Sequence, residues 1–316
     1  MTIDSSIKQH PYGGPSLRSR FMTWFLKRSF KSKVIQESME FSYLRNAMEK
    51  QAAGKKHERG VTATPVSETG VKGEWQIPER IAPVCRDAVF LYLHGGGYAF
   101  GSPATHRAMT TGIARKAGIK VFSLDYRLAP EHPYPAPVED AVEAYRWLLD
   151  QGVKPERIIV SGDSAGGGLS MALLLSLKQQ QLPLPAGAIL LSPWTDMTVS
   201  GDSHHDNQMS CAMFDRNAIR RGAENYLSGA AATEPLASPL MGDLSGLPPI
   251  SIHVSDSEVL RDDSLRLLEQ QTAADTSIDI HIWKKQPHVW PVFYPLLPEA
   301  KHCINDMTAF IHQQLT

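Results

Sequence analysis

The chain has 316 residues, of which 42% are hydrophobic and 21% are charged, and its formal net charge is -1. This composition is typical of a soluble globular protein with a sizeable core, built as one large α/β domain or two smaller ones. The charge balance argues against nucleic-acid binding, and no apolar run approaches the roughly 18 residues of a membrane span.

The cysteines and the first residues bear on the compartment. Cys85, Cys211 and Cys303 are widely spaced and lack the C-x-x-C pairing of zinc ribbons and redox sites. Met1 to Tyr12 offers no apolar core of a secretory signal. We therefore expect reduced thiols in a cytoplasmic protein.

The segment before Gly60 is basic, with twelve Lys or Arg residues against five acids. Apolar side chains lie among these charges, and their spacing predicts one or two amphipathic helices. They are Phe21, Trp24, Phe25, Leu26, Met39, Phe41, Tyr43, Leu44 and Met48. We favour a helical cap that packs its aromatic side on the main domain over the alternative, an anchor at a membrane surface.

The pattern from Gly60 onward predicts strands and helices in alternation. Gly60 to Gln76 is expected to form a hairpin of outer strands. Apolar strands are predicted at Ala88–Leu93, Lys120–Tyr126, Arg157–Ser161, Ala186–Leu191, Ile250–Ser255 and Ile278–Trp283. Helices are predicted at Thr105–Ala117, Pro137–Asp150, Ala165–Gln181, Val259–Ala273 and Glu299–Gln313. This alternation indicates an α/β fold with a mostly parallel sheet covered by helices on both faces.

The long interval between Leu191 and Ile250 breaks the alternation. It contains one predicted helix, Asn217–Tyr226, between loops rich in Pro, Gly and Ser. An insertion at the carboxyl side of a strand is well placed to roof a site. We expect residues 1–55 and 196–234 to form a cap over a main domain made of residues 56–195 and 235–316.

Gly162-Asp163-Ser164-Ala165-Gly166 joins a predicted strand to a predicted helix. This G-x-S-x-G pattern places a serine on a sharp, strained turn, and the two glycines give the turn the clearance it needs. Ser164 is therefore the candidate nucleophile. The backbone N–H of Ala165 points toward any negative charge that forms beside it.

A glycine run, His94-Gly95-Gly96-Gly97, follows the strand that ends at Leu93. The residues after it complete neither a phosphate loop nor a dinucleotide fingerprint, so phosphate binding is disfavoured. Gly95, Gly96 and Gly97 can instead present backbone N–H groups that form an oxyanion hole with Ala165.

A serine nucleophile requires a base, and for this motif the acid and then the histidine follow the serine in chain order, from loops beyond strand ends. His288 lies just after the last predicted strand and is the candidate base. The other histidines lie within strands, on the last helix or beside prolines: His253, His281, His302, His312 and His132. His204 and His205 lack a second pair of ligands, so no metal site is expected.

The acid is expected after the strand that ends at Ser255. Glu258 is the first choice and Asp256 the alternative, although either could be an ordinary carboxylate at a helix start. Asp262 and Asp263 lie one helical turn further on and are expected to be solvated.

Five motifs together resemble the hormone-sensitive-lipase-like branch of the α/β-hydrolases, in particular its bacterial-type carboxylesterases. They are His94-Gly95-Gly96-Gly97, the stretch Asp125 to Glu131, Gly162 to Gly167, Ser192-Pro193-Trp194-Thr195-Asp196 and Pro287-His288-Val289-Trp290. The resemblance runs from about Ala88 to the C-terminus. It implies an α/β-hydrolase fold with a helical cap, and a carboxylesterase that acts on short to medium acyl esters without a cofactor.

Carried across by motif, the resemblance places the nucleophile on Ser164, the base on His288 and the oxyanion donors on Gly95–Gly97 and Ala165. Many relatives have Asp-Pro-Leu where this chain has Glu258-Val259-Leu260, so the match is to a Glu-bearing subgroup and Asp256 stays open. Asp125, Arg127 and Glu131 are expected to support the oxyanion loop, and Asp196 to support the site without reacting.

The resemblance also implies a small-molecule ester as substrate and a homodimer through an edge strand. Two other functions fit parts of the pattern. The same groups could hydrolyse another acyl bond, such as an aryl amide, carbamate or lactone. The second alternative is a ligand-binding protein on a hydrolase scaffold, like the plant hormone receptors that resemble this family. Those receptors lack the catalytic histidine, so the presence of His288 argues against this alternative.

Overall fold

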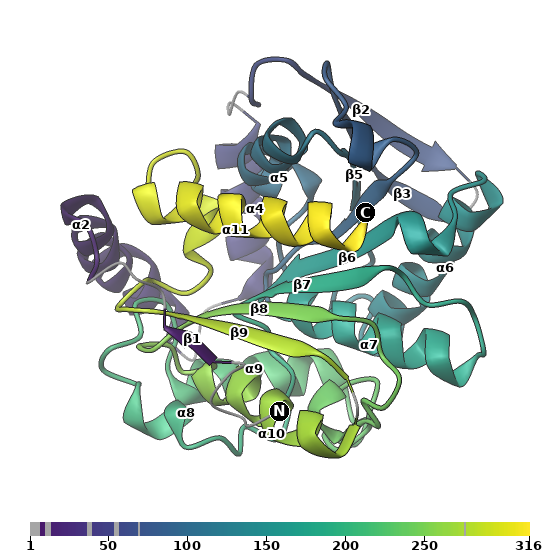
Figure 1. Ribbon diagram of the computed structural model, residues 1–316. Coiled ribbons are helices and arrows are strands. Elements are labelled where there is room, and N and C mark those ends of the chain that lie inside the picture. The colour runs from purple at the N-terminus through teal and green to yellow at the C-terminus, as the bar shows by residue number, and fades with distance from the viewer. Residues whose placement is uncertain (1–6, 10–13, 37–39, 54–56, 69, 275) are drawn as a thin grey trace.

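The computed structural model describes residues 7–9, 14–36, 40–53, 57–68, 70–274 and 276–316. Its centre is a sheet with strand order β1-β9-β8-β7-β6-β4-β5-β3-β2 (Figure 1). The strands are β1 (Ile7–Gln9), β2 (Val61–Glu68), β3 (Val71–Pro78), β4 (Val89–Leu93), β5 (Lys120–Leu124), β6 (Ile158–Asp163), β7 (Gly187–Leu191), β8 (Ile250–Ser255) and β9 (Ile278–Trp283). The strands from β1 to β5 in this order run parallel, and β3 and β2 are antiparallel additions at one edge.

Helices cover both faces of the sheet because its strands are apolar on both sides. Along β4, Phe90 and Tyr92 pack with α5 (Pro103–Ala117) and α11 (Pro298–Gln314), which contact each other on one face of the sheet; α11 runs across the front in Figure 1. Leu91 and Leu93 face the other way, toward α6 (Ala136–Asp150) and α7 (Ala165–Gln179). α10 (Arg261–Ala274) extends this second layer over β8 and β9. The predicted α/β-hydrolase fold is confirmed.

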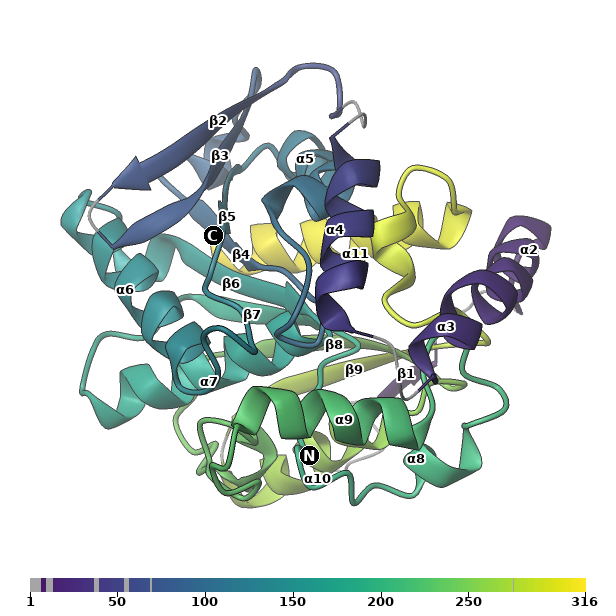
Figure 2. The ribbon, with the colours of Figure 1, turned by 180° about the vertical axis from the view of Figure 1, so that it is seen from behind.

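Short helices and the elements of the two segments expected to form a cap complete the described structure. The single turns are η2 (Pro83–Cys85), η3 (Pro155–Arg157), η4 (Pro239–Met241) and η5 (Trp290–Phe293). The N-terminal segment forms α2 (Leu17–Leu26), the π-helical η1 (Lys27–Lys31), α3 (Ser32–Val34) and α4 (Phe41–Ala52). The interval after β7 contains α8 (Ser203–Asp206) and α9 (Arg216–Leu227). α4 and α9 lie on the side of the molecule that faces the viewer in Figure 2.

Two features of the N-terminal segment differ from expectation. Ile7–Gln9 was expected to belong to the cap, but it pairs with β9 as an edge strand of the main sheet. The aromatic side of the first helix was expected to pack on the main domain. In α2, however, Phe21, Trp24 and Phe25 are exposed, and Ser19 and Leu26 are the buried positions.

The second cap helix does pack as expected. Leu44 is buried in an apolar cluster with Ala99 and Phe100 of the main domain, and Phe41 and Met48 lie against this cluster. Met39 lies outside the described residues. α4 therefore packs on the loop that follows β4.

None of the described helices is both long enough and apolar enough to cross a membrane. Cys85, Cys211 and Cys303 are buried free thiols, as the sequence predicted.

Candidate active site

Ser164 occupies a sharp turn between the end of β6 and the start of α7. Its backbone lies in a region that non-glycine residues rarely adopt, with φ 52° and ψ -119°. The Ser164 N–H donates to the Leu191 carbonyl at 2.8 Å, and its carbonyl accepts from the Trp194 N–H at 2.9 Å. A Cβ at Gly166 would lie 2.0 Å from the Leu93 carbonyl oxygen, so only glycine fits there. The end of β7 and the loop that follows it therefore hold the strained turn in place.

His288 meets this serine from the loop after β9. Its Nε2 lies 2.9 Å from the Ser164 Oγ, and both side chains are buried. The Phe214 ring and the imidazole pack in a T-shaped arrangement, with ring centroids 5.3 Å apart. The two residues, 124 positions apart in the sequence, are thus in hydrogen-bond contact, which is the arrangement a serine nucleophile and its base require.

Glu258 holds the other side of the imidazole. One carboxylate oxygen is hydrogen-bonded to the His288 Nδ1. The other oxygen accepts the Ser192 hydroxyl and the Ser255 N–H, each at 2.8 Å. The Ser192 hydroxyl in turn accepts the Val289 N–H at 3.3 Å. The carboxylate is therefore fixed from three directions.

Asp256, the alternative acid, lies elsewhere. Its carboxylate accepts the Lys285 N–H at 2.7 Å, so it fixes the loop after β9. Of the two acids that the sequence left open, the structure brings Glu258 to His288.

The glycine run requires one correction. The Gly95 N–H donates to the Asp163 carboxylate at 2.8 Å, so this N–H is already engaged and is not available to an oxyanion. Gly96 and Gly97 have positive φ angles of 122° and 59°. An added Cβ at Gly97 would meet no atom within 4 Å, so this part of the loop borders open space. The candidate donors are therefore Gly96, Gly97 and Ala165.

Asp163 is a site residue that the sequence analysis missed, although it stands next to Ser164 within the motif. It is buried, and its carboxylate accepts the Tyr92 hydroxyl and the Gly95 N–H and lies 3.4 Å from the His106 Nε2. Burial alone would raise the pKa of this carboxyl. The His106 ring and the hydrogen bonds from Tyr92 and Gly95 outweigh burial, and the pKa lies below its ordinary value. Asp163 therefore ties the nucleophile turn to the glycine run as a carboxylate.

His94 also supports the glycine run. Its ring stacks on Tyr126 with centroids 4.2 Å apart, and its Nδ1–H donates to the Gly95 carbonyl at 2.8 Å. Burial, and then the neighbouring His106, lower the pKa of His94 to about 3. The ring is consequently neutral at physiological pH.

Arg45, on cap helix α4, reaches the loops around the site. Its guanidinium donates to the carbonyls of Ala99 at 2.9 Å and Ala129 at 2.8 Å, and it pairs with both carboxylate oxygens of Glu131. Ala99 lies two positions after Gly97, the last residue of the glycine run. Glu131 thus supports the oxyanion loop, as the resemblance implied, through a cap residue that the sequence analysis did not single out.

Arg127 does not play the part expected of it. It pairs with Asp140 and Glu139 of α6, and within the described part of the chain its guanidinium makes no hydrogen bond to the glycine run. It instead fixes the start of the loop that follows β5.

Asp263 was expected to be solvated, and this was wrong. It is fully buried, and its carboxylate accepts the N–H groups of Thr195 at 2.7 Å and Asp196 at 3.0 Å. Burial raises the pKa of Asp263. The Asp196 carboxylate accepts Ser200 and the Arg266 guanidinium. Both acids fix the loop after β7, which carries Ser192.

The described histidines offer little to a metal ion. His253, His281 and Asp306 place one ligand atom each within 4.8 Å of one another. The Trp283 indole N–H, however, donates to the His253 Nδ1 at 3.3 Å. In a neutral ring the proton then resides on Nε2, which removes that nitrogen as a ligand.

His204 and His205 point to different surroundings. His204 is buried beside Asp263, whereas His205 is exposed beside Asp206. The two adjacent rings therefore do not converge on a common metal position.

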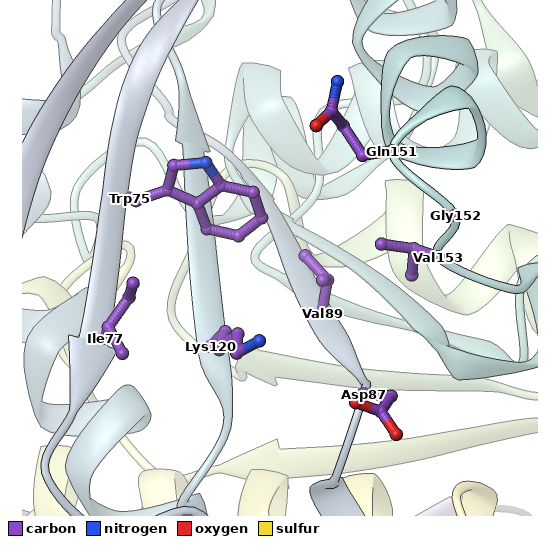
Figure 3. Close-up of a pocket in the computed structure, with 8 residues that line it drawn as sticks. All are labelled: Trp75, Ile77, Asp87, Val89, Lys120, Gln151, Gly152 and Val153. Carbon is purple, nitrogen blue, oxygen red and sulfur yellow. The ribbon is translucent and has the colours of Figure 1, made fainter.

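A separate groove, of about 340 Å³, lies away from Ser164. Figure 3 shows the Trp75 ring turned toward it, with Val89 and Lys120 below. Val89 and Lys120 begin β4 and β5, so the groove lies at the amino ends of strands whose carboxyl ends lead to the candidate site. Ser164 does not line this groove.

Comparisons with known proteins identify the family of this chain. A family model of the alpha/beta hydrolase fold matches residues 90–292. An acetyl-hydrolase from Streptomyces hygroscopicus is 44% identical over 234 residues, which cover 74% of this chain and 78% of that protein. An esterase from Acinetobacter venetianus is 38% identical over 251 residues, covering 79% and 82%.

A solved structure extends the likeness to nearly the whole chain. The crystal structure of an esterase from the bacterial hormone-sensitive lipase family has a TM-score of 0.88 and 40% identity, and the match covers 95% of this chain and 99% of that one. The chain therefore belongs to the α/β-hydrolase family, in its hormone-sensitive-lipase branch, and the resemblance stated from the sequence is confirmed.

Proposed function

We propose that this ester hydrolase cleaves short to medium acyl esters with Ser164 as nucleophile, His288 as base and Glu258 as the acid that orients it. The observation that carries the proposal is the continuous chain of contacts from Glu258 through the His288 ring to the Ser164 Oγ, 2.9 Å from Nε2. Similarity to an acetyl-hydrolase and to esterases supports the same reaction class.

The reaction proceeds in two halves. Ser164 attacks the ester carbonyl while its proton passes to the His288 Nε2, and Glu258 stabilises the imidazolium that forms. The oxyanion is bound by N–H groups of Gly96, Gly97 and Ala165. The imidazolium then protonates the departing alcohol, and water hydrolyses the acyl-enzyme by the reverse proton path. These side chains complete every step, so the proposal needs no cofactor.

Aromatic side chains of the cap support the choice of substrate class. Phe214 packs on His288, and Phe30 packs edge-on against Phe214 with centroids 5.8 Å apart. Such a wall beside the serine limits the length of the acyl chain. Phe214→Ala should shift the preferred p-nitrophenyl ester toward longer chains, whereas Tyr43→Ala, at an exposed aromatic of the cap, should leave the profile unchanged.

The decisive experiment is labelling with a fluorophosphonate probe. The wild type should form one covalent adduct, Ser164→Ala should form none, and the exposed Ser210→Ala should react as the wild type does. Folded wild-type protein without an adduct would favour the alternative, a ligand-binding protein on this scaffold. A higher kcat/KM for matched anilides than for esters would favour hydrolysis of another acyl bond.

Two further points belong to the proposal. We expect a cytoplasmic protein with reduced thiols. A homodimer through an edge strand would form at β1 or β2, and Pro65 in β2 lacks the N–H that a neighbouring strand needs. Light scattering after size exclusion measures the mass and decides between monomer and dimer.

A further inference from the structure

We propose that helix α2 docks this enzyme on an anionic phospholipid surface. Four apolar side chains spaced along one side of the helix are exposed: Leu17 at 80%, Phe21 at 63%, Trp24 at 50% and Phe25 at 48%. Their positions, i, i+4, i+7 and i+8, place them on a single helical stripe. These four side chains do not belong to any apolar core cluster of the described residues. Figures 1 and 2 show α2 standing out at the edge of the molecule.

The opposite side of α2 is already anchored. The Ser19 hydroxyl donates to Gln286 at 2.6 Å, and Leu26 is buried. Before the helix, the Ser16 N–H donates to the buried Glu299 carboxylate at 2.6 Å. The helix is therefore fixed to the domain by its inner face, and the aromatic stripe is presented outward on a rigid support.

The segment that carries the stripe is basic. Residues 14–36 contain six Lys or Arg residues and no Asp or Glu. The Arg28 guanidinium lies over the Trp24 ring, 5.1 Å from its centroid. An aromatic stripe with a basic border is the pattern of helices that lie in the interface of an anionic bilayer.

A groove beside Trp24 adds a place for phosphate headgroups. It measures about 850 Å³, and four cations line it: Arg20, Lys27, Lys284 and Lys285. Asp256 also lines it, but its carboxylate accepts the Lys285 backbone N–H. Two basic segments from opposite ends of the chain thus meet next to the aromatic stripe.

Charge also decides between a lipid surface and a second copy of the chain. A twofold contact through this stripe would bring the same basic border against itself, which is unfavourable. An anionic bilayer offers opposite charge to the border and an apolar layer to the aromatic rings. The inference does not depend on the reaction at Ser164.

Co-sedimentation of the full chain with vesicles tests the proposal. The wild type should sediment with phosphatidylcholine vesicles that contain phosphatidylglycerol, weakly with phosphatidylcholine alone, and less as salt increases. Phe21→Ser/Trp24→Ser should weaken binding by about a hundredfold, and Lys284→Glu/Lys285→Glu by at least about tenfold. The matched controls Ile77→Ser and Arg80→Glu, exposed on and after β3, should bind as the wild type does.

Activity on a water-soluble ester shows that each variant is folded, since none of these residues contacts the serine, its base or the acid. The proposal is overturned if the wild type stays in the supernatant, if all variants sediment equally, or if phosphatidylcholine alone is bound as well. It is also overturned if size exclusion shows a dimer that only Phe21→Ser/Trp24→Ser dissociates, because the stripe would then be an interface between copies.

Discussion

The carboxylate of Asp163 accepts the backbone N–H of Gly95 at 2.8 Å, across 68 positions of sequence. Asp163 precedes the nucleophile, and Gly95 begins the run that offers N–H groups to the oxyanion. One hydrogen bond therefore sets the spacing between the two halves of the site. A Cβ at Gly95 would lie 2.2 Å from the same carboxylate, so the contact requires glycine there.

Asp163→Asn should lower kcat for p-nitrophenyl acetate by about tenfold or more and leave KM nearly unchanged, because misplaced oxyanion donors weaken transition-state binding alone. Steady-state kinetics measures both parameters. Asp263→Asn is the control, since that buried carboxylate accepts N–H groups of the Thr195 loop instead. Asp263→Asn should lower the melting temperature, and it should lower kcat less than Asp163→Asn does. Equal kcat losses in both variants would mean that Asp163 has no special link to the oxyanion site.

Glu258→Ala should reduce kcat by roughly a thousandfold or more, because the His288 ring loses its orienting partner and the stabilisation of its charged form. Asp256→Ala should stay near the wild-type rate, since that carboxylate serves the Lys285 backbone. Ester assays at saturating substrate measure kcat for the two variants. The reverse order of rates would move the acid to Asp256.

Arg45→Met should lower kcat/KM by about tenfold and destabilise the fold by roughly 1–3 kcal/mol, since the carbonyls of Ala99 and Ala129 lose a charged donor. Thermal melts and ester kinetics on the same preparation record both effects. The control is Arg115→Met, because Arg115 is exposed and pairs with Glu58. This variant should change kcat/KM and stability little. If the two variants behave alike, Arg45 does not hold the oxyanion loop.

Stability should depend on the protonation of His94. Its folded pKa, about 3, lies below the ordinary value near 6.5, so the unfolded chain binds the proton more readily. The stabilising contribution is complete above about pH 6.5 and is lost as the pH falls toward the folded value. From about pH 7 to about pH 5, the wild type should lose about 2 kcal/mol more than His94→Gln. Urea unfolding at both pH values measures this difference, and parallel losses would exclude His94 as the titrating group.

The sequence predicted the strands well, and it singled out three side chains that the structure brings together, Ser164, His288 and Glu258, because both leave local signals. A parallel strand buried on both faces is an apolar run, and the G-x-S-x-G turn needs glycines at fixed places. His288 and Glu258 follow from chain order, because carboxyl ends of parallel strands meet at one edge.

Most of the errors arise because a residue's surroundings depend on distant parts of the chain. α2 has apolar residues on two sides, and its spacing does not say whether Ser19 and Leu26 or Phe21 and Trp24 face the domain. Asp263 is buried only because the Thr195 loop closes over it. Gly95 lost its expected role through a contact with Asp163 that no local pattern contains. Ile7–Gln9, with three residues, is too short for a periodic signal.

The pairing of Ile7–Gln9 with β9 also has a consequence during synthesis. The ribosome makes Ile7 long before its partner Ile280, which lies in Ile278–Trp283 and is 273 positions further along the chain. At roughly 5–20 residues per second, the nascent N-terminal strand waits tens of seconds for its neighbour. This edge of the sheet is therefore completed only after the strands that lie between β1 and β9 in the chain have been synthesised.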